Sequence, residues 1–418
     1  MIALIADDLT GASDAGVQFA RRGLATHVVF DVPEQACTAD VEALAVDTET
    51  RAASPVEAYR RVRDVADRLC AMQPDHVYKK VDSTLRGNLG AEIDAVMDAF
   101  DLQLAVVAPS YPVMARTTRY GTHRLHGIPV HETEIGRDPK TPVRESNLVR
   151  LLESGSRRRS ALVSLETVEL GPQAIRDEVD ALALERGVSL VVCDAETDRA
   201  LRAVGESLAD RRGVLWVGSA GLAEHLADLL ELPQRTYVAP AIDASDGPVL
   251  LVTGSVSEIT RQQVAAFLAR PGVSEVALDP CASSIGGEPA RCAELERCCQ
   301  RLHAALVRGS DCALIVDPRV GQVADADRLV DALGRIAANA ARSHRLRGLI
   351  LTGGDTARAV CRHLGVSGIH LLAEVQPGVP LGRLVGNSAV QLLAVTKAGA
   401  FGSERTLLDA LDRLKGDT

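Results

Sequence analysis

The chain has 418 residues, of which 46% are hydrophobic, 24% charged and 3% aromatic, and its 46 basic and 56 acidic side chains give a net charge of −10. This composition is typical of a folded globular protein and excludes general disorder, and the length predicts two or three domains at about 100–200 residues each. The negative charge argues against binding nucleic acid by neutralising phosphates, and the few aromatic residues argue against a stacking surface. We therefore expect a polar small molecule as partner, with no nucleic acid and no membrane.

The N-terminal segment and the cysteines bear on where the protein works. No run of residues approaches the roughly 20 apolar positions of a membrane span. The apolar start, Met1–Ala6, lacks a basic region and runs directly into Asp7 and Asp8, which predicts a buried strand rather than a signal peptide. The nine cysteines form no C-x-x-C pair; a zinc site among the five from Cys281 to Cys312 stays open, but reduced core thiols are favoured. We expect a cytoplasmic protein.

In the first half of the chain, short apolar runs alternate with amphipathic stretches. The runs predicted as strands are Ile2–Ala6, Ala25–Phe30, Ala43–Val46, His76–Lys80, Leu104–Ala108, Ala161–Leu165, Leu190–Cys193 and Val214–Val217. The stretches predicted as helices include Pro55–Met72, Gly90–Phe100, Gln173–Glu185 and Ala220–Leu230. Short strands rich in Val, Ile and Leu that are separated by helices indicate a parallel sheet covered on both faces.

One segment of this half, Pro109–Ser146, does not fit the alternation. It contains five prolines and several basic residues and has no sustained period. A loop of this length inside a compact domain is usually functional or mobile. An arm that packs on a neighbouring domain or subunit explains the segment equally well.

The alternating pattern breaks over residues 232–248, where there are three prolines and little periodicity. We interpret this stretch as a linker between a domain over residues 1–231 and a second domain over residues 249–418. The strands predicted in the second domain are Val249–Thr253, Val273–Leu278, Ala313–Val316, Leu349–Leu351, Gly368–Leu372 and Ala389–Thr396, and the helices include Glu258–Ala269 and one near Glu404–Leu414. The prediction is an α/β protein of two domains, each with a mostly parallel sheet flanked by helices, and with the active site in the cleft between them.

Ligands of open parallel sheets bind outside the carboxyl ends of the strands, so the turns after the predicted strands are the candidate sites. The first turn follows IALIA and begins with Asp7 and Asp8, followed by Thr10 and Gly11. Adjacent carboxylates at this position can hold Mg²⁺, accept hydrogen bonds from hydroxyls of a substrate or act as a base. One of them can instead cap the following helix, although a pair followed by Thr-Gly favours a site.

The second turn, KKVDSTLRGNLG, collects more polar residues than a structural turn needs. It contains Lys79, Lys80, Asp82, Ser83, Thr84, Arg86 and Asn88. Such a mixture suits a ligand that bears both a carboxylate and hydroxyls, because Arg and Lys bind carboxylate while Asp fixes a hydroxyl. Arg51 follows the third predicted strand and is a candidate to join this group, although a single arginine is weak evidence.

Two turns of the second domain have the form of a phosphate cradle. A strand runs into Gly254 and Ser255, and another runs through Gly353–Thr356 into a helix. Glycines let backbone N–H groups converge on a phosphate, and the start of a helix adds partial positive charge. Neither turn has the Walker or the Rossmann pattern, and each alone is equally well explained as a capped helix start. Together with Lys397–Gly402 after the last strand, they favour a nucleotide.

These segments, in order along the chain, resemble the motifs of the four-carbon acid sugar kinases. The matching blocks are IADDLTGASDAGVQFA, KKVDSTLRGNLGAEI, PSYPVMARTT, VGSAGLA, TGSVSEITRQQ, LTGGDTA, EVQPGVPLG and TKAGAFG, which span about Met1 to Leu414. The resemblance implies a sugar-acid-binding N-terminal domain, an ATP-binding C-terminal domain and transfer of phosphate to the terminal hydroxyl of the acid. This chain departs from the family pattern at one point: in SYPVMART, Ala115 stands before the arginine where a glycine is expected.

Members of this family act on D-threonate, D-erythronate or 3-oxo-tetronates. The motif DSTLRGN, with Arg86, is more similar to the threonate and erythronate kinases, since a lysine is expected at this position in the 3-oxo-tetronate enzymes. D-threonate or D-erythronate is therefore the favoured substrate, and a 3-oxo-tetronate is next. A homodimer is among the expected assemblies.

The resemblance, together with the residue types in the turns, gives functional roles to individual positions; the resemblance itself implies Asp8, Arg51 and Lys80–Ser83 for the sugar acid and Ser255, Gly353–Thr356 and Gly399 for ATP. The residues expected to contact the sugar acid are Asp7, Asp8, Arg51, Lys80, Val81, Asp82, Ser83 and Arg86, and those expected to contact ATP are Ser255, Gly353, Gly354, Asp355, Thr356, Lys397 and Gly399. Arg51, Lys80 and Arg86 would hold the carboxylate end of the acid. Asp8 and Asp82 would orient hydroxyls, and Asp82 is preferred as the group that accepts the proton. Mg²⁺ would accompany ATP, with Asp7 or Asp355 as candidate ligands and no ligand assigned.

Two other functions remain as alternatives to a kinase. A non-catalytic sensor that binds a sugar acid between two domains explains the charged N-terminal turns but not the glycine turns of the second domain. A ligase that uses ATP, or a phosphatase, is also compatible with an α/β scaffold, because a fold does not determine chemistry.

Overall fold

The computed structural model describes residues 1–33, 40–232, 246–255, 257–284, 287–318, 325–386, 392–399 and 401–416. The chain divides into two compact units, Met1–Tyr237 and Val238–Thr418. Most of the linker predicted over residues 232–248 lies outside the described residues. Each unit is an α/β structure with a mostly parallel sheet flanked by helices, which confirms the predicted fold class.

The first unit is built on a parallel sheet of β2, β3, β1, β4, β11, β5, β10 and β9, in this spatial order. The strands are β1 (Ile2–Ala6), β2 (Thr26–Val29), β3 (Ala43–Asp47), β4 (His76–Lys80), β5 (Leu104–Ala108), β9 (Ser160–Val163), β10 (Leu190–Cys193) and β11 (Val214–Gly218). Every residue of β1, β3, β4, β5, β10 and β11 is buried. Strands that are buried on both faces need helices on both sides, which explains their nearly continuous apolar sequences.

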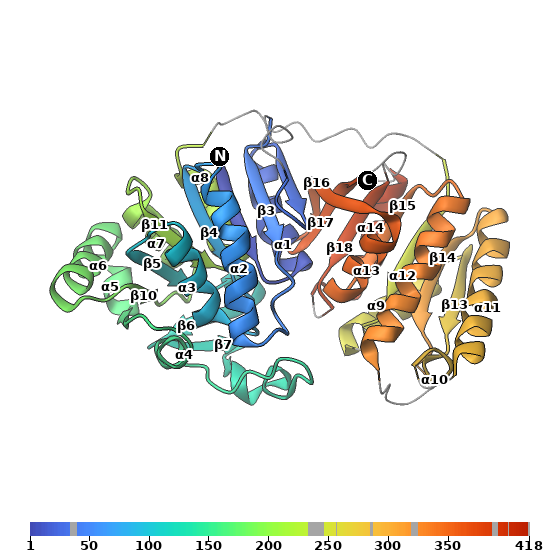
Figure 1. Cartoon of the computed structure of the whole chain (residues 1–418), viewed down its shortest axis with the longest axis horizontal. Helices are drawn as coiled ribbons and strands as arrows, with labels where there is room; N and C mark the ends of the chain where they lie inside the picture. Colours follow the sequence, from blue (N-terminus) through green and yellow to red (C-terminus); the bar gives the residue numbers. More distant parts are fainter. Residues whose placement is uncertain are drawn as a thin grey trace. The chain divides into compact units, whose positions relative to one another are not determined.

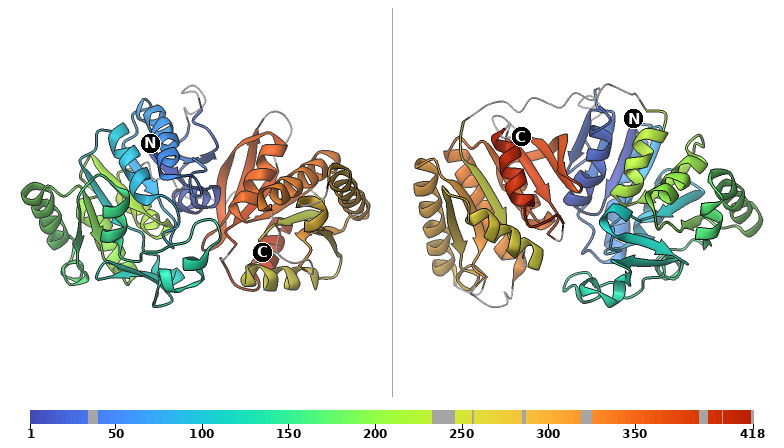
Figure 2. Two further views of the ribbon diagram at one scale, coloured as in Figure 1. Left: turned by 60° about the horizontal axis from the view of Figure 1, so that its bottom comes forward. Right: turned by 180° about the vertical axis from the view of Figure 1, so that it is seen from behind.

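Helices cover both faces of this sheet (Figures 1 and 2). They are α1 (Leu9–Ala20), α2 (Pro55–Cys70), α3 (Leu89–Ala99), α4 (Leu148–Gly155), α5 (Leu165–Glu169), α6 (Pro172–Arg186), α7 (Asp198–Leu208) and α8 (Ala220–Leu229). Helices α2 and α3 pack against each other, and α1, α8 and α7 pack in series. Helix α1 follows β1 directly, and α3 follows the turn after β4, so both helices begin at the carboxyl edge of the sheet.

The second unit has parallel strands in the order β13, β14, β12, β15 and β18, followed by the antiparallel strands β17 and β16. The strands are β12 (Val249–Thr253), β13 (Val273–Leu278), β14 (Asp311–Val316), β15 (Gly348–Thr352), β16 (Val366–Gln376), β17 (Val379–Gly386) and β18 (Leu393–Lys397). The helices are α9 (Glu258–Leu268), α10 (Pro280–Ser284), α11 (Glu288–Val307), α12 (Ala326–Ser343), α13 (Gly354–Leu364) and α14 (Thr406–Lys415). Helices α9 and α14 pack over the sheet face that contains Leu251, Ile350 and Val395.

The segment Pro109–Ser146 is more ordered than its sequence predicts. It contains a small antiparallel sheet of β6 (Arg116–Arg119), β7 (Thr122–Leu125) and β8 (Ile128–Pro129), with single 3₁₀ turns at Pro112–Met114, Val130–Glu132 and Glu134–Arg137. The strands were missed because each has at most four residues and a mixed polar sequence, which is too short for a period to be recognised. The segment belongs to the first unit, and its short strands were not predicted; its role, as a functional loop or as a packing arm, stays a prediction.

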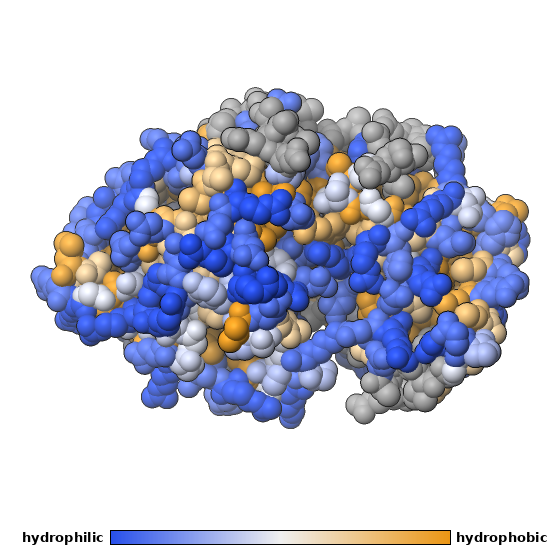
Figure 3. Space-filling model, viewed as in Figure 1, coloured by the Kyte–Doolittle hydropathy of each residue, from blue (hydrophilic) through white to orange (hydrophobic). Residues whose placement is uncertain are grey.

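No helix of the described residues is long and apolar enough to cross a membrane. On the face seen in Figure 3, hydrophilic residues predominate and hydrophobic ones occur in small groups. The described cysteines are all free. No group of three or more His, Cys, Asp or Glu side chains that could hold a metal occurs in the part of the chain that the structure describes.

Candidate functional site

Three strand ends come together in the first unit. Strand β1 lies between β3 and β4, and Ala6 pairs with Asp47 on one side and with Lys80 on the other. The segments after these strands therefore leave the sheet side by side, at the edge where ligands of parallel sheets bind. These segments carry all the residues predicted to contact a sugar acid: Asp7, Asp8, Arg51, Lys80, Val81, Asp82, Ser83 and Arg86.

Arg51 binds two consecutive carboxylates. Its Nε and Nη2 donate to the two oxygens of Asp7 at 2.8 and 2.9 Å, and its Nη1 and Nη2 donate to those of Asp8 at 2.8 and 2.7 Å. Burial by itself raises the pKa of Asp7, but the charge and hydrogen bonds of Arg51 outweigh burial and leave this pKa lowered. Arg51 thus ties the end of β1 to the segment after β3 through charge-assisted hydrogen bonds.

Asp8 has two roles in this structure. It is the N-cap of α1 and accepts a hydrogen bond from the Gly11 N–H at 2.8 Å, while the Thr10 hydroxyl donates to its other oxygen. The same carboxylate binds Arg51. The two explanations offered for an aspartate at this turn, a helix cap and a site residue, are therefore both compatible with its contacts.

Asp82 and Arg86 form a bidentate pair within the turn after β4. Arg86 Nε and Nη2 donate to the two Asp82 oxygens at 2.9 and 3.0 Å, and the Thr84 hydroxyl and N–H donate to the same carboxylate. Burial alone raises the pKa of Asp82, whereas the charges of Arg86 and Arg51 lower it well below its ordinary value. Asp82 is therefore ionised at neutral pH, and both of its oxygens already accept hydrogen bonds.

Lys80 and Ser83 each have a polar side-chain group that is not bound to a carboxylate. The Lys80 side chain is buried, and its ammonium donates to the Val81 carbonyl at 3.0 Å. Within the described chain, Lys80 forms no ion pair, and the Ser83 hydroxyl has no hydrogen-bond partner. A buried ammonium without an anion is unfavourable, so Lys80 is the group here that gains most from a bound carboxylate.

Gly11 leaves room for this ammonium. A β-carbon at position 11 would lie 2.6 Å from Asp8 Oδ1 and 3.1 Å from Lys80 Nζ. Gly11 belongs to α1, where alanine would otherwise be the better helix former. The glycine is therefore required because both charged groups lie close to position 11, and not by helix geometry.

Residues that sequence analysis did not assign also reach this cluster. Glu92, in the first turn of α3, forms an ion pair of 2.8 Å with Lys79, and both side chains are buried. Arg116, at the start of β6, is buried; burial lowers its pKa, and the charge of Asp82 acts in the opposite direction. Both residues lie in motifs used for the family resemblance, GAEI and MART, and this was the one signal in the sequence that could have identified them.

Three strand ends also meet in the second unit. Thr352 of β15 pairs with Thr253 of β12 on one side and with Lys397 of β18 on the other. The turns that follow these strands therefore lie side by side. These turns carry the residues predicted to contact ATP: Ser255, Gly353, Gly354, Asp355, Thr356, Lys397 and Gly399.

The glycines of these turns are closely approached by hydroxyl groups. A β-carbon at Gly399 would lie 2.6 Å from Ser255 Oγ, and one at Gly254 would lie 3.0 Å from Thr356 Oγ1. Gly353 has a φ of +94°, a conformation that favours glycine, and it leaves the start of α13 without a side-chain cap. Uncapped N–H groups at the start of a helix, together with hydroxyls from the neighbouring turns, suit the phosphates of a nucleotide.

Lys397 donates to its own loop. Its ammonium donates to the carbonyl oxygens of Ala398, Gly399 and Phe401 at 2.8, 3.1 and 3.1 Å. Burial lowers the pKa of Lys397 to about 7. The Lys397 side chain thus shapes the turn that contains Gly399, and its three hydrogen bonds are satisfied without a phosphate.

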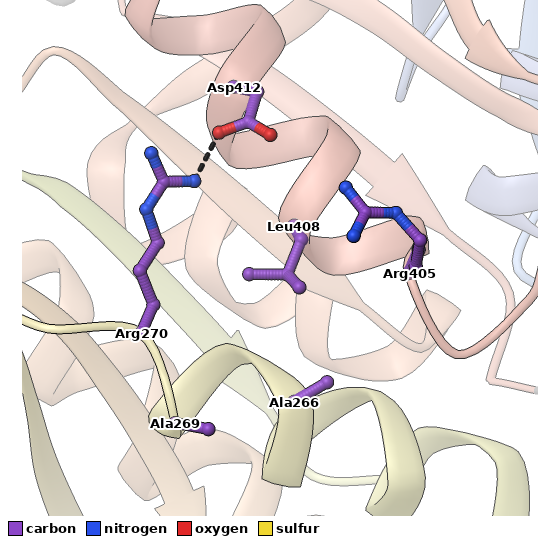
Figure 4. Close-up of a pocket in the computed structure, with 6 residues that line it drawn as sticks. All are labelled: Ala266, Ala269, Arg270, Arg405, Leu408 and Asp412. Carbon is purple, nitrogen blue, oxygen red and sulfur yellow. Dashed lines mark hydrogen bonds and ion pairs between the residues drawn. The ribbon is translucent and has the colours of Figure 1, made fainter.

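A separate groove lies between α9 and α14 in the second unit (Figure 4). It is lined by Ala266, Ala269, Arg270, Arg405, Leu408 and Asp412. Arg270 forms an ion pair with Asp412 across one side of the groove. None of the residues predicted for either ligand lines this groove.

Two family models match the chain. Residues 2–226 match a sugar-binding N-terminal domain, and residues 250–407 match a nucleotide-binding C-terminal domain. A D-threonate kinase from Salmonella typhimurium is 36% identical over 98% of this chain and 97% of its own length, and a D-erythronate kinase from Heliobacterium modesticaldum is 32% identical over 99% and 97%. A crystal structure of a Salmonella typhimurium LT2 protein, 27% identical, matches 99% of both chains with a TM-score of 0.82. The chain therefore belongs to the four-carbon acid sugar kinase family.

Proposed function

We propose that this protein phosphorylates the terminal hydroxyl of a four-carbon sugar acid with ATP, and that D-threonate is the favoured acid. The observation that carries the proposal is the composition of the first cluster. The carboxylates of Asp7, Asp8 and Asp82 are matched by Arg51 and Arg86, and the Lys80 ammonium has no carboxylate partner. Such a cluster offers hydrogen-bond acceptors to hydroxyls and one unmatched cation to a carboxylate.

In this proposal, Lys80 binds the carboxylate of the acid, and Arg51 and Arg86 adjust their hydrogen bonds to assist. The Ser83 hydroxyl, which has no partner among the described residues, binds an oxygen of the substrate. Val81 contributes through its main chain, because its carbonyl holds Lys80 and its N–H donates to Gly218 at 2.9 Å. Charge neutralisation and positioning of this kind are the main requirements of phosphoryl transfer.

Asp82 is the preferred acceptor of the hydroxyl proton, and Asp8 is the second candidate. The pKa of Asp82 lies well below its ordinary value because of Arg86 and Arg51, so the carboxylate is available in its ionised form. A low pKa makes Asp82 a weak base. This weakness is acceptable here because phosphoryl transfer asks for little proton removal before the transition state.

The turns of the second unit are proposed to hold ATP. Ser255, Gly353–Thr356 and Gly399 would surround the phosphates, and Lys397 would maintain the shape of the turn. Mg²⁺ would bind chiefly to the phosphates and water, as it usually does in such enzymes, with Asp7 or Asp355 as candidate protein ligands. Mg²⁺ would supply charge neutralisation for the transferred phosphoryl group.

One observation places D-threonate before D-erythronate, and another places both of these acids before the 3-oxo-tetronates. The D-threonate kinase reported above is more similar to this chain than the D-erythronate kinase, at 36% against 32% identity. The turn after β4 also keeps the DSTLRGN sequence with Arg86, which resembles the threonate and erythronate kinases. We further propose that the enzyme works in the cytoplasm, where free thiols such as those of its described cysteines persist.

The experiment that tests the proposal measures ADP release with Mg-ATP over a panel of D- and L-threonate, D- and L-erythronate and their 3-oxo derivatives. Turnover with D-threonate in excess of the others, together with a phosphorylated acid in the product, would support the proposal. Turnover with another acid alone would retain the kinase and reject the substrate. If none of the acids is phosphorylated although ATP raises the melting temperature, the proposed substrate class is wrong. The same panel run with Lys80→Met is the control for catalysis by a contaminating kinase.

A further inference from the structure

A buried histidine from the segment that sequence analysis left without a role contacts the candidate substrate turn. His123 lies in β7, its side chain is fully buried, and its Nε2 is 2.9 Å from the Ser83 carbonyl oxygen. Among the groups that the structure describes, His123 alone donates to this carbonyl. The contact joins a strand of the small antiparallel sheet to the residue whose hydroxyl we assign to the substrate.

The donor and the acceptor of each hydrogen bond around His123 can be assigned. A carbonyl oxygen can only accept, so Nε2 carries the proton and donates to Ser83. Burial lowers the pKa of His123 to about 4, so the ring is neutral at pH 7 and Nδ1 is an acceptor. The Thr118 hydroxyl, 2.8 Å away, therefore donates to Nδ1 and in turn accepts from the Ser110 hydroxyl at 2.9 Å.

The small sheet that carries His123 is itself fixed to the main sheet of the first unit. The buried Asp194 carboxylate, directly after β10, accepts from the N–H groups of Tyr120 and Gly121 at 2.7 and 2.9 Å. Thr118 and Ala195 exchange two backbone hydrogen bonds of 3.0 Å. The position of the imidazole is therefore set by the end of β10 and by Ser110 after β5, and not by the turn that it contacts.

We propose that His123 is a positioning residue, which holds the Ser83 carbonyl through the Ser110–Thr118–His123 chain so that the Ser83 hydroxyl and the Asp82–Arg86 pair face the acid. The catalytic part of this inference rests on the proposed function. A histidine that only fills the core would be replaceable by an apolar side chain of similar size. A positioning histidine needs a donor at Nε2.

The test compares His123→Leu, which removes both ring hydrogen bonds, with His123→Gln, whose side-chain amide can still donate toward Ser83. Thr118→Val is a smaller change that leaves the Nε2 hydrogen bond in place and removes the hydrogen bonds of the Thr118 hydroxyl to Nδ1 and to Ser110. It keeps the test available if the leucine variant fails to fold. His131→Leu is the matched control, because His131 lies in the same segment but bonds Ser146 and not the turn.

The first readout is hydrogen exchange of the Thr84, Leu85 and Arg86 amides, all of which donate to Asp82. We expect exchange to be at least tenfold faster in His123→Leu, intermediate in Thr118→Val, and close to the unmodified protein in His123→Gln and His131→Leu. Unchanged exchange in the leucine and valine variants would overturn the proposal. This readout does not require activity, so it decides the inference even if no acid is phosphorylated.

The second readout compares the KM for the acid with the KM for ATP. We expect the KM for the acid to rise at least tenfold in His123→Leu while the KM for ATP stays within twofold, and we expect His123→Gln to restore most of the loss. An equal rise of both KM values, or no rescue by glutamine, would show that the histidine acts only through overall stability and would overturn the proposal. Absence of turnover in the unmodified protein would instead reject the proposed function.

Discussion

Arg86 reaches back four residues and donates to both carboxylate oxygens of Asp82, at 2.9 and 3.0 Å. A proton acceptor must offer one oxygen to the attacking hydroxyl. The substrate therefore has to take the place of one of these hydrogen bonds, or share its acceptor. This requirement allows the two roles of Asp82, as a base and as the anchor of Arg86, to be separated by mutation.

Asp82→Asn is expected to lower kcat by about 10²–10⁴-fold, the usual contribution of a general base. The asparagine still offers an oxygen to Arg86, so the turn should keep its main contact. The measurement is ADP release at saturating acid and ATP, with the melting temperature recorded for each variant. Arg86→Gln is the companion variant and should chiefly raise the KM for the acid. A near-normal kcat for Asp82→Asn would leave Asp82 with the anchoring role alone.

Gly11→Ala is expected to weaken binding of the acid at least tenfold, because the added β-carbon would overlap Asp8 Oδ1 and crowd Lys80 Nζ. The helix itself should tolerate alanine, which is favoured over glycine by about 1 kcal/mol. Calorimetric titration of the acid measures the effect. Gly155→Ala in α4 is the control, since its β-carbon would meet only Gly90 at an ordinary 3.6 Å. Equal affinity of Gly11→Ala and the unmodified protein would separate Lys80 from the acid site.

Lys397→Met is expected to raise the KM for ATP and leave the KM for the acid unchanged. The reason is that the ammonium holds three carbonyl oxygens of the turn around Gly399, and methionine cannot donate to them. Steady-state kinetics with each substrate varied in turn measure the split. Lys415→Met, at the end of α14, is a matched control because Lys415 contacts Gly247 and Asp311 but no residue of the nucleotide turns. A rise in the KM for the acid would contradict this assignment.

Ala115→Gly is expected to increase the free energy of unfolding by roughly 0.5–1 kcal/mol. Ala115 has a φ of +58°, the left-handed conformation in which a β-carbon is unfavourable. This observation gives a physical reason for the glycine that the family resemblance led us to expect at this position. Urea unfolding measures the change, and Ala99→Gly, at the last position of α3, should have the opposite sign. A destabilised Ala115→Gly variant would show that the strain at this residue is negligible.

The stability of the first unit is expected to depend on pH through His123. Burial lowers the pKa of His123 to about 4 in the folded protein, against 6.5 as its ordinary value; the charge of Asp82 opposes this shift and that of Arg116 adds to it. Between these values the unfolded chain binds the proton more readily, so the free energy of unfolding decreases as the pH falls from about 6.5 towards 4. From pH 7.5 to pH 5 the histidine should contribute a loss on the order of 2 kcal/mol.

Urea unfolding of the unmodified protein and of His123→Gln at both pH values measures this contribution. The loss between pH 7.5 and pH 5 should be smaller in the glutamine variant, because its side chain does not titrate. Identical pH dependence of the two proteins would mean that His123 has the same pKa in the folded and unfolded chain, which would contradict a pKa lowered by burial.

Much of the fold could be predicted because the parallel strands are short, apolar and followed by polar turns. The predicted runs Ile2–Ala6, His76–Lys80, Leu104–Ala108 and Val249–Thr253 coincide with β1, β4, β5 and β12. The C-terminal hairpin was predicted less accurately. The predicted strand Gly368–Leu372 is shorter than β16, which spans Val366–Gln376. The predicted strand Ala389–Thr396 corresponds to β18, which begins at Leu393; residues 387–391 lie outside the described residues. Between them, β17 spans Val379–Gly386 and was not predicted. Strand β17 was missed because prolines at 377 and 380 discourage the assignment of a strand.

For the candidate site as well, the local sequence identified the residues but not the contacts between them. The residues of the first cluster could be named because they follow strands that are neighbours in a parallel sheet, and their types fit a hydroxy acid. The partner of each residue could not be named. That Arg51 binds Asp7 and Asp8, and that His123 supports Ser83, depends on side chains brought together across about 40 residues of chain. No local pattern in the sequence records such contacts.

One backbone carbonyl oxygen in the second unit, that of Gly399, joins two segments of the nucleotide turns. The Gly399 carbonyl accepts from the Ser257 hydroxyl at 2.9 Å, the Thr260 hydroxyl at 2.7 Å and the Lys397 ammonium at 3.1 Å. The first turn of α9 and the loop after β18 are thereby fastened to the same atom, so neither can shift without carrying the other. The start of α13 has no side-chain cap, but the Gly353 N–H donates to the Lys397 carbonyl at 2.8 Å and joins it to the end of β18. When these turns adjust to ligands of different size, α9 and the loop after β18 should therefore move together.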